Sequence, residues 1–215
     1  MPMAEQKVQL RCYSYIDMLQ PQFASYFATV ARGYLPKAGQ AALFIEIAPG
    51  MPINRITDVA VKATSVTVGE LIVERSFGFL EIHHDSQAEV MQAGRAILDY
   101  LGIDESDRLK PKLVTNQIIK RVNDYHSMLI NRSTKGMMLV RDQSLYIGET
   151  VPAGYAAYAA NEAEKAADIN IINVRAVGRF GRYYIGGTES EVQAAMQAAT
   201  VAVNALEGKE EERKK

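Results

Sequence analysis

The sequence predicts an α/β fold in which two tandem copies of one small domain follow each other along the chain. Runs in which apolar residues alternate are interleaved with runs that place apolar residues at helical spacing. The order strand, helix, strand, helix, two strands, helix occurs twice. The length of 215 residues suffices for two domains of about 100 residues each. We therefore expect each half to form a small antiparallel sheet with flanking helices.

Each element of the first half follows from its own pattern. Residues Val8–Ile16 alternate as in a strand, whereas Leu19–Tyr34 places apolar residues at helical spacing. The apolar strand Ala41–Ala48 stops at the turn pair Pro49-Gly50. The remaining elements are an amphipathic helix at 53–63, strands Gly69–Val73 and Phe79–His84, and a helix between Ser86 and Gly102. On the amphipathic helix, Asp58 precedes Lys62 by four residues, the favourable order for an ion pair.

A polar, charged segment that ends in proline, Ile103–Pro111, separates the halves and is the best candidate for a linker. The second half is expected to contain strand Lys112–Val122, a helix at 123–132, strand Ser144–Thr150, helix Tyr155–Ala167, strands Ile169–Arg175 and Gly181–Gly187, and helix Glu189–Leu206. The charge run Glu207–Lys215 is expected to be solvated. This gives domains at 8–102 and 112–208, an N-terminal extension at 1–7, a linker at 103–111 and a C-terminal tail at 209–215.

The second half repeats the first at a constant offset of 103 positions. Matching positions carry the same residue in the pairs Gly33 and Gly136, Glu46 and Glu149, Pro49 and Pro152, Lys62 and Lys165, and Phe77-Gly78 and Phe180-Gly181. After a slip of one residue, Ser86-x-x-Glu89 matches Thr188-x-x-Glu191, so a capping box is expected to open the last helix of each half. A period this long indicates a tandem duplication of one domain.

Composition limits the classes of function. A net charge of −1 lacks the basic footprint of a general nucleic-acid binder. The apolar runs are only strand-length, and the N-terminus has no secretory pattern, so neither a membrane span nor a signal peptide is expected. The only cysteine, Cys12, fits a reducing cytosol and is expected to be a small strand residue. No metal-ligand spacing, phosphate-binding loop or nucleophile–base pattern is found, so no metal, cofactor or enzymatic activity is expected.

The turn Val73–Gly78 joins two strand-like runs and distinguishes the halves. It places Glu74 beside Arg75, whereas the matching positions hold Val177 and Gly178. Exposed ion pairs are worth about 0–1 kcal/mol, so an ordinary solvated turn explains the local residues. Because the scaffold is shared and this turn differs, specialisation of the turn is the alternative. Arginines make the second turn basic: Arg175, Arg179 and Arg182.

Several segments together resemble the tandem-domain shell proteins of bacterial microcompartments. The segment Asp58–Val66, followed by a strand and a turn ending in glycine, is similar to the shell domain, and Asn161-x-x-x-Lys165-Ala-Ala repeats it. Further matching segments are Ile45–Gly50, Asn54-Arg55, Val73–Arg75, Arg108–Lys112, Gln117–Ile119, Leu129–Arg132 and Ala159–Ala166. The resemblance covers about residues 8–208 and is greatest to the minor carboxysome shell proteins that form gated, stacked trimers.

The resemblance implies two circularly permuted shell domains per chain and a homotrimeric, pseudohexameric tile in the shell of a cytoplasmic compartment. It implies a pore loop at Glu74, Arg75, Ser76, Phe77 and Gly78, and a second-domain pore turn at Val177, Gly178 and Arg179. It also implies that Lys62 and Lys165, with Asp58 nearby, lie at the edge between tiles. Two trimers are expected to stack, other shell proteins are the expected partners, and small anionic metabolites are expected to pass the pore.

Two functions from different classes remain open. The first is a structural shell tile with a gated pore, of either the carboxysome or a catabolic compartment. The alternative is a trimeric metabolite-sensing α/β protein that forms no shell lattice. The residues do not distinguish the compartments or name the metabolite.

Overall fold

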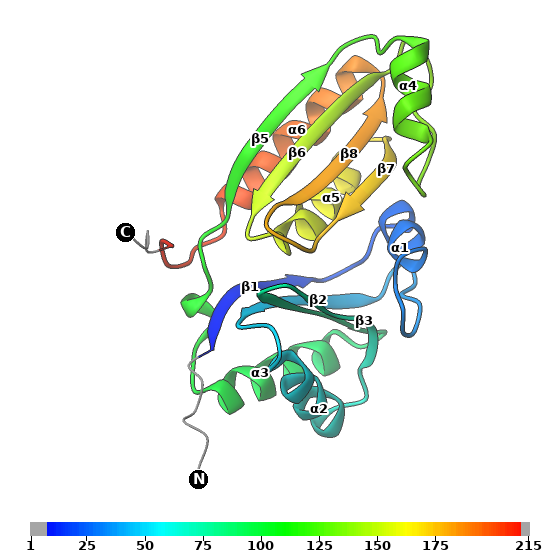
Figure 1. The fold of residues 1–215 in the computed structure, drawn as a ribbon. Coiled ribbons are helices and arrows are strands. Elements are labelled where there is room, and N and C mark those ends of the chain that lie inside the picture. The colour runs from blue at the N-terminus through cyan, green and yellow to red at the C-terminus, as the bar shows by residue number, and fades with distance from the viewer. Residues whose placement is uncertain (1–7, 212–215) are drawn as a thin grey trace.

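The computed structural model describes residues 8–211 and contains two four-stranded antiparallel sheets, one in each half. The strand orders are β1-β2-β4-β3 and β5-β6-β8-β7, so the halves share one topology. Figure 1 shows the halves stacked, with α1 and α5 where they meet and α2 and α3 on the far side of the first sheet. The predicted α/β fold with small antiparallel sheets and flanking helices is confirmed.

The elements of the first half are β1 Gln9–Ile16, α1 Pro21–Ala28, β2 Ala41–Ala48, α2 Ile53–Ala63, β3 Thr67–Glu74, β4 Phe77–His84 and α3 Gln87–Leu101. A short 3₁₀ turn, Glu105–Asp107, follows. The second half contains β5 Lys112–Ile119, α4 Asp124–Asn131, β6 Ser144–Val151, α5 Tyr155–Ala166, β7 Asn170–Arg175, β8 Gly181–Gly187 and α6 Glu189–Asn204. The bounds of β1, α1 and β2 recur 103 positions later in β5, α4 and β6, as the repeat predicts.

The apolar core has a part that both halves share. On one face of the first sheet, Leu80 and Ile82 pack with α2 and α3. On the other face, Phe44 and Phe79 join α1 and the alanine-rich α5 in one continuous cluster. The Phe27 and Phe44 rings meet edge to face at 5.4 Å. Since aromatic pairs of this geometry add to the energy of burial, this pair stabilises the packing of α1 on β2 at the joint.

The predicted helix Leu19–Tyr34 is wrong in its length, because α1 covers only Pro21–Ala28. Beyond it, the backbone N–H groups of Gly33 and Tyr34 donate to carbonyl oxygens of β3 at 2.8 and 2.9 Å. A side chain on Gly33 would overlap the Val68 carbonyl oxygen. The chain therefore leaves the helix to follow the edge of the sheet. Similarly, the strand expected to reach residue 122 ends at Ile119.

The two predicted capping boxes have different outcomes. The Thr188 hydroxyl accepts the Glu191 N–H at 3.4 Å, and the Glu191 carboxylate accepts the Thr188 N–H at 2.8 Å. The Ser86 side chain makes no capping bond to α3. The Glu89 carboxylate instead accepts the Ser65 N–H at 2.8 Å. The capping box is therefore confirmed in the second half. It is wrong in the first half, because Ser65, outside α3, bonds the Glu89 carboxylate.

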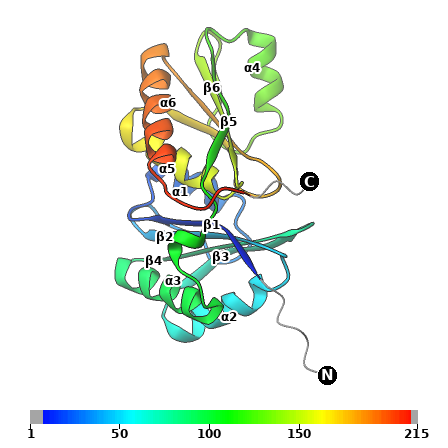
Figure 2. The same cartoon turned by 90° about the vertical axis from the view of Figure 1, so that its left-hand side faces the viewer.

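The expectation that Glu207–Lys215 is solvated is confirmed for the described part, since four of its five residues are exposed, although its backbone is bonded to the segment before β5. Lys209 donates its N–H to the Arg108 carbonyl at 2.7 Å and accepts the Lys110 N–H at 2.9 Å. The Glu211 carboxylate reaches Arg11 at 3.1 Å. Figure 2 shows this segment crossing beside the start of β5. The extension at 1–7 and residues 212–215 lie outside the described residues.

We expect Thr188→Ala to lower the free energy of unfolding by about 1 kcal/mol, because it removes an N-cap bond. The matched variant Ser86→Ala should change it by only a few tenths of a kcal/mol, since no capping bond is lost. Urea denaturation at one protein concentration measures both. Equal losses in the two variants would contradict the assignment of the caps.

Candidate functional site

The first candidate site is formed by the β3–β4 and β7–β8 turns, which lie side by side. The Glu74 carboxylate accepts from Arg175 Nη2 at 3.2 and 3.4 Å. A pocket of about 390 Å³ separates the turns. Its lining residues are Arg11, Glu74, Arg75, Ser76, Phe77, Val151, Gly178, Arg179, Phe180 and Glu211. The structure thus brings together most of the residues that the sequence proposes for a pore.

Within this site, Glu74 is not bonded to Arg75, its neighbour in the sequence. Glu74 is held by Arg175 from the other half, while Arg75 is exposed and takes a positive φ of 54°. Gly178 also has a positive φ, of 104°, which favours glycine. A side chain on Gly78 would overlap the Gly50 carbonyl oxygen. The glycine in the repeated Phe-Gly pair is therefore required by close backbone approach.

Arg11 lies at the base of the pocket and is a residue that the sequence does not single out. Its Nε donates to Glu46 Oε1 at 2.6 Å, with the side chains 5% and 1% exposed. Glu46 Oε2 also accepts the Gly154 N–H at 3.0 Å, and the guanidinium lies 4.0 Å from the centre of the Phe77 ring. Burial raises the pKa of Glu46, although Arg11 opposes the shift. This pair links β1, β2, the first turn and the second half.

Burial also decides the role of Cys12, which is fully buried on β1. Burial raises the pKa of its thiol well above the usual value, so the thiol is protonated near neutral pH. The expectation that Cys12 is a small strand residue is confirmed.

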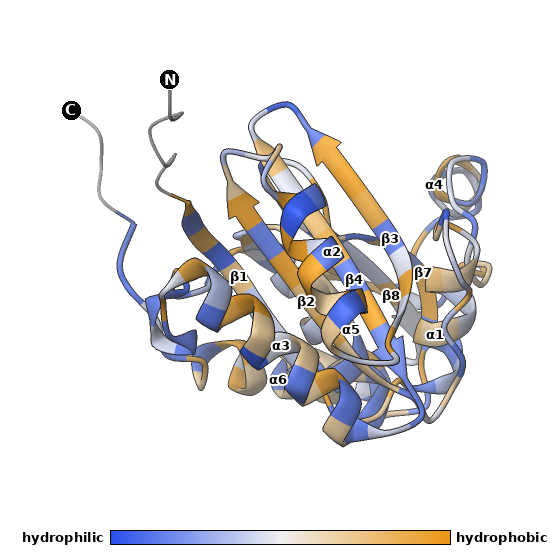
Figure 3. Ribbon diagram, turned by 90° about the horizontal axis from the view of Figure 1, so that it is seen from below, coloured by the Kyte–Doolittle hydropathy of each residue, from blue (hydrophilic) through white to orange (hydrophobic). Residues whose placement is uncertain are grey.

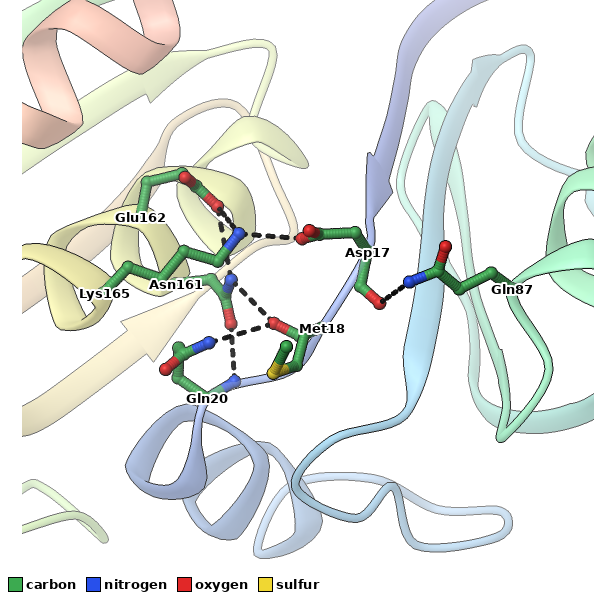
Figure 4. Close-up of polar contacts among 7 residues, drawn as sticks. All are labelled: Asp17, Met18, Gln20, Gln87, Asn161, Glu162 and Lys165. Atoms are coloured by element: carbon green, nitrogen blue, oxygen red, sulfur yellow. Dashed lines mark hydrogen bonds and ion pairs between the residues drawn. The ribbon is translucent and has the colours of Figure 1, made fainter.

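The two repeated lysines have different surroundings. Lys62 bonds Asp58 at 2.7 Å on an exposed face, which confirms the predicted ion pair of α2. Lys165 bonds Asp17 and Glu162, both at 2.8 Å, and its side chain is 30% exposed. Figure 4 shows Lys165 reaching from α5 across to Asp17 at the end of β1. Lys165 therefore contributes to the joint between the halves, while a role of either lysine between tiles stays a prediction.

The second candidate site is the joint itself, where the N-terminus of α1 rests on α5. The two Glu164 carboxylate oxygens accept the N–H groups of Gln22 and Phe23, each at 2.8 Å. The Asn161 side-chain oxygen accepts the Gln20 N–H at 2.9 Å, as Figure 4 also shows. Because the first N–H groups of a helix lack partners within it, α5 completes α1.

This joint covers only one side of each half. Strand β1 is largely buried, whereas the matching β5 is intermediate or exposed throughout. Four residues of α1 are buried but only Ser127 of α4, and seven residues of α5 are buried but four of α2. The uncovered faces are α4 with β5, and α2 with β3. Several large apolar side chains are exposed on them: Val61, Leu71, Val73, Val114, Met128 and Leu129.

A groove of about 600 Å³ lies on the uncovered face of the first half, beside the edge strand β3. Its lining includes Val61, Val66, Val68 and Leu71. Figure 3 shows the largely hydrophobic β3 at the edge of its sheet. Exposed apolar patches of this kind typically mark interaction surfaces.

Two further searches limit the possible functions. Residues 8–211 contain no cluster of three or more His, Cys, Asp or Glu side chains that could hold a metal ion. None of the helices described combines the length and the apolar character that crossing a bilayer requires.

Comparisons with known proteins agree on one family. A family profile described as the CsoS1D N-terminal domain matches residues 10–107. The chain is 50% identical over 203 residues to carboxysome shell protein CcmP of Synechococcus elongatus, covering 94% of this chain and 95% of that protein. It is 48% identical over 200 residues to carboxysome shell protein CsoS1D of Hydrogenovibrio crunogenus, covering 93% and 98%.

Two solved structures are similar over nearly the whole chain. One is a fused permuted hexameric shell protein of the RMM microcompartment, with a TM-score of 0.91, 44% identity and coverage of 94% of this chain and 100% of that one. The other is a double ringed trimeric shell protein of the same compartment, with a TM-score of 0.91, 41% identity and coverage of 95% and 100%.

We expect Glu46→Ala to lower the free energy of unfolding by up to about 3–5 kcal/mol, because it removes the buried partner of Arg11. The half-exposed Glu211 carboxylate, 3.1 Å from Arg11, is then its only remaining acidic partner among the described residues. The matched residue Glu149 bonds Arg182 at 2.7 Å, with side chains 22% and 50% exposed. Glu149→Ala should therefore cost only about 0–1 kcal/mol. Urea denaturation at one low protein concentration measures the difference, and a small loss in both variants would count against the role given to Arg11.

Proposed function

Because the chain belongs to the family of tandem-domain carboxysome shell proteins, we propose that three copies form a pseudohexameric shell tile with a gated central pore. The structural role in a microcompartment shell follows from the family. The proposed domains are residues 8–102 and 112–208, joined by 103–111. The relatives named as carboxysome shell proteins favour the shell of a carboxysome, in the cytoplasm, and a role that is not enzymatic.

The main support for a closed ring is that the joint within the chain covers only one side of each half. Within the chain, β1 and α1 of the first half contact α5 and β7 of the second. The same contact between chains would place α4 and β5 of one copy on α2 and β3 of the next. A repeated head-to-tail contact forms a ring when its rotation closes. The trimeric relative of the RMM microcompartment supports closure at three copies.

The pore is proposed to lie where the turns of the ring converge, at Glu74–Gly78 and at Val177, Gly178 and Arg179. Three copies of Arg75 at one axis would repel by roughly 4 kcal/mol per pair at about 4 Å and an effective dielectric of about 20. The Glu74 carboxylate can offset this repulsion or stay with Arg175, as in this structure. Two arrangements of similar energy form a gate, and a metabolite that binds one of them shifts the population.

The charges around the pocket support anionic passengers. Three arginines and two glutamates, Arg11, Arg75, Arg179, Glu74 and Glu211, line it, so the lining is positive on balance. The charge of a pore lining biases which ions enter. Small anionic metabolites are therefore the proposed passengers. The double ringed relative supports stacking of two trimers, and other shell proteins are the proposed lattice partners through the edge that includes Lys62, Lys165 and Asp58.

The tile is tested by solution mass and electron microscopy of the purified chain. We expect a trimer or a pair of trimers, and sheets or closed shells when other shell proteins are added. Discrete trimers that bind a metabolite and never tile would favour the sensing alternative. A single protomer at micromolar concentration would overturn the ring.

The gate is tested with Glu74→Ala and Arg175→Gln, each of which removes the bond that holds the first turn. Both variants should assemble as the parent chain does, while their crystal structures show a changed position of Arg75. Arg182→Gln is the control, because Arg182 bonds Glu149 and not the first turn. Turn conformations identical to those of the parent chain in all three variants would refute the gate.

A further inference from the structure

Glu70 is a buried acid with an unsatisfied oxygen on the uncovered face of the first half. Its side chain is 4% exposed, and its Oε1 atom has no hydrogen-bond partner among the residues described. The nearest cation is Arg32 of the same half, whose Nε lies 3.9 Å away and whose side chain is 79% exposed. Buried carboxylates normally have a cation or several donors beside them, so Glu70 lacks part of its surroundings.

The matching residue of the second half shows what this position contacts. Asn173 follows the irregularity in β7 and lies opposite Tyr184, as Glu70 follows the irregularity in β3 and lies opposite Glu81. The Asn173 side-chain oxygen accepts a hydrogen bond from the Tyr26 hydroxyl of α1. In the joint within the chain, this strand position therefore forms a hydrogen bond to the helix that packs on it from the other half.

Applying the same contact between chains places α4 of one copy over Glu70 of the next. Leu129 takes the place of Tyr26 and offers no donor. Arg132 lies three residues further along the same helix face and is exposed. Helical side chains lean toward the N-terminus, so its guanidinium is directed back over Leu129 and toward the carboxylate. His126, on the preceding turn, leans in the same direction and therefore away from Leu129.

We propose that Arg132 of one copy binds Glu70 of the next copy in a buried, charge-assisted pair that holds the joint between chains. This inference rests on the proposed ring. At this strand position it makes the two kinds of joint chemically different, because the matching contact within the chain is a neutral Tyr26–Asn173 bond. An α4 helix placed on β7 would leave Arg132 facing a neutral amide, so the pair also directs α4 to the first half of a neighbour.

A double-mutant cycle on the full chain tests the pair through the monomer–trimer dissociation constant, measured by mass photometry and sedimentation. Arg132→Gln should raise that constant at least about tenfold, because it leaves the buried carboxylate with only the long contact to the exposed Arg32. In the Glu70→Gln background, the same change should have an effect of less than about threefold, since no charge remains to be paired. Arg132→Lys should recover part of the loss.

Two control variants show whether the coupling is specific to Glu70 and Arg132. Arg32→Gln removes the cation of the same chain, and His126→Gln alters the same face of α4. Neither effect should depend on whether residue 70 is Glu or Gln. Far-ultraviolet circular dichroism of each variant checks that the protomer is folded.

The outcomes distinguish failure of the pair from failure of the ring. If the parent chain is trimeric but Arg132→Gln acts equally in both backgrounds, or if Arg32→Gln shows the coupling instead, the pair is refuted and the ring stands. If the parent chain is a single protomer at every concentration, both fall. Coupling confined to Glu70 and Arg132 supports both.

Discussion

Each half of this protein has two sides that need to be covered, and the joint within the chain covers only one side of each. The consequence is visible at matching positions. Strand β1 and helix α1 are buried, while β5 and α4 leave apolar side chains in water. Apolar surface gains free energy when it leaves water, so the uncovered faces favour association. The proposed ring and its proposed pore both depend on how this association is completed.

The joint combines a shared apolar core with a few directional polar contacts. Alanines along α5 allow the first sheet to approach closely, and Glu164 and Asn161 receive the free N–H groups at the start of α1. These bonds fix the orientation of one half against the other, whereas the apolar core supplies most of the burial. The same orientation brings the β3–β4 and β7–β8 turns together, so that Glu74 meets Arg175. The site is thus a product of the joint and not of either half alone.

The elements and the duplication could be predicted because they depend on local periodicity and on a constant offset in the sequence. The end of α1 could not, since backbone bonds from Gly33 and Tyr34 to a distant strand decide it. Ser86 and Thr188 occur in the same local pattern, but Glu89 is drawn to Ser65 by the tertiary fold. In the turn, adjacency suggested Glu74 with Arg75, whereas the structure supplies Arg175 from the other half. Arg11 gave no signal, because its partner Glu46 lies on a neighbouring strand.

The contrast between Glu164 on α5 and Val61 at the matching position of α2 has a consequence for how such rings change in evolution. In a ring of six identical single-domain chains, one substitution is repeated at every contact, and a harmful effect is multiplied by six. Fusing two copies into one gene lets alternate contacts vary independently. A substitution that adds a charge then affects half of the contacts, while the other half still hold the ring together. Tandem fusion therefore widens the range of tolerated chemistry without altering the geometry of the tile.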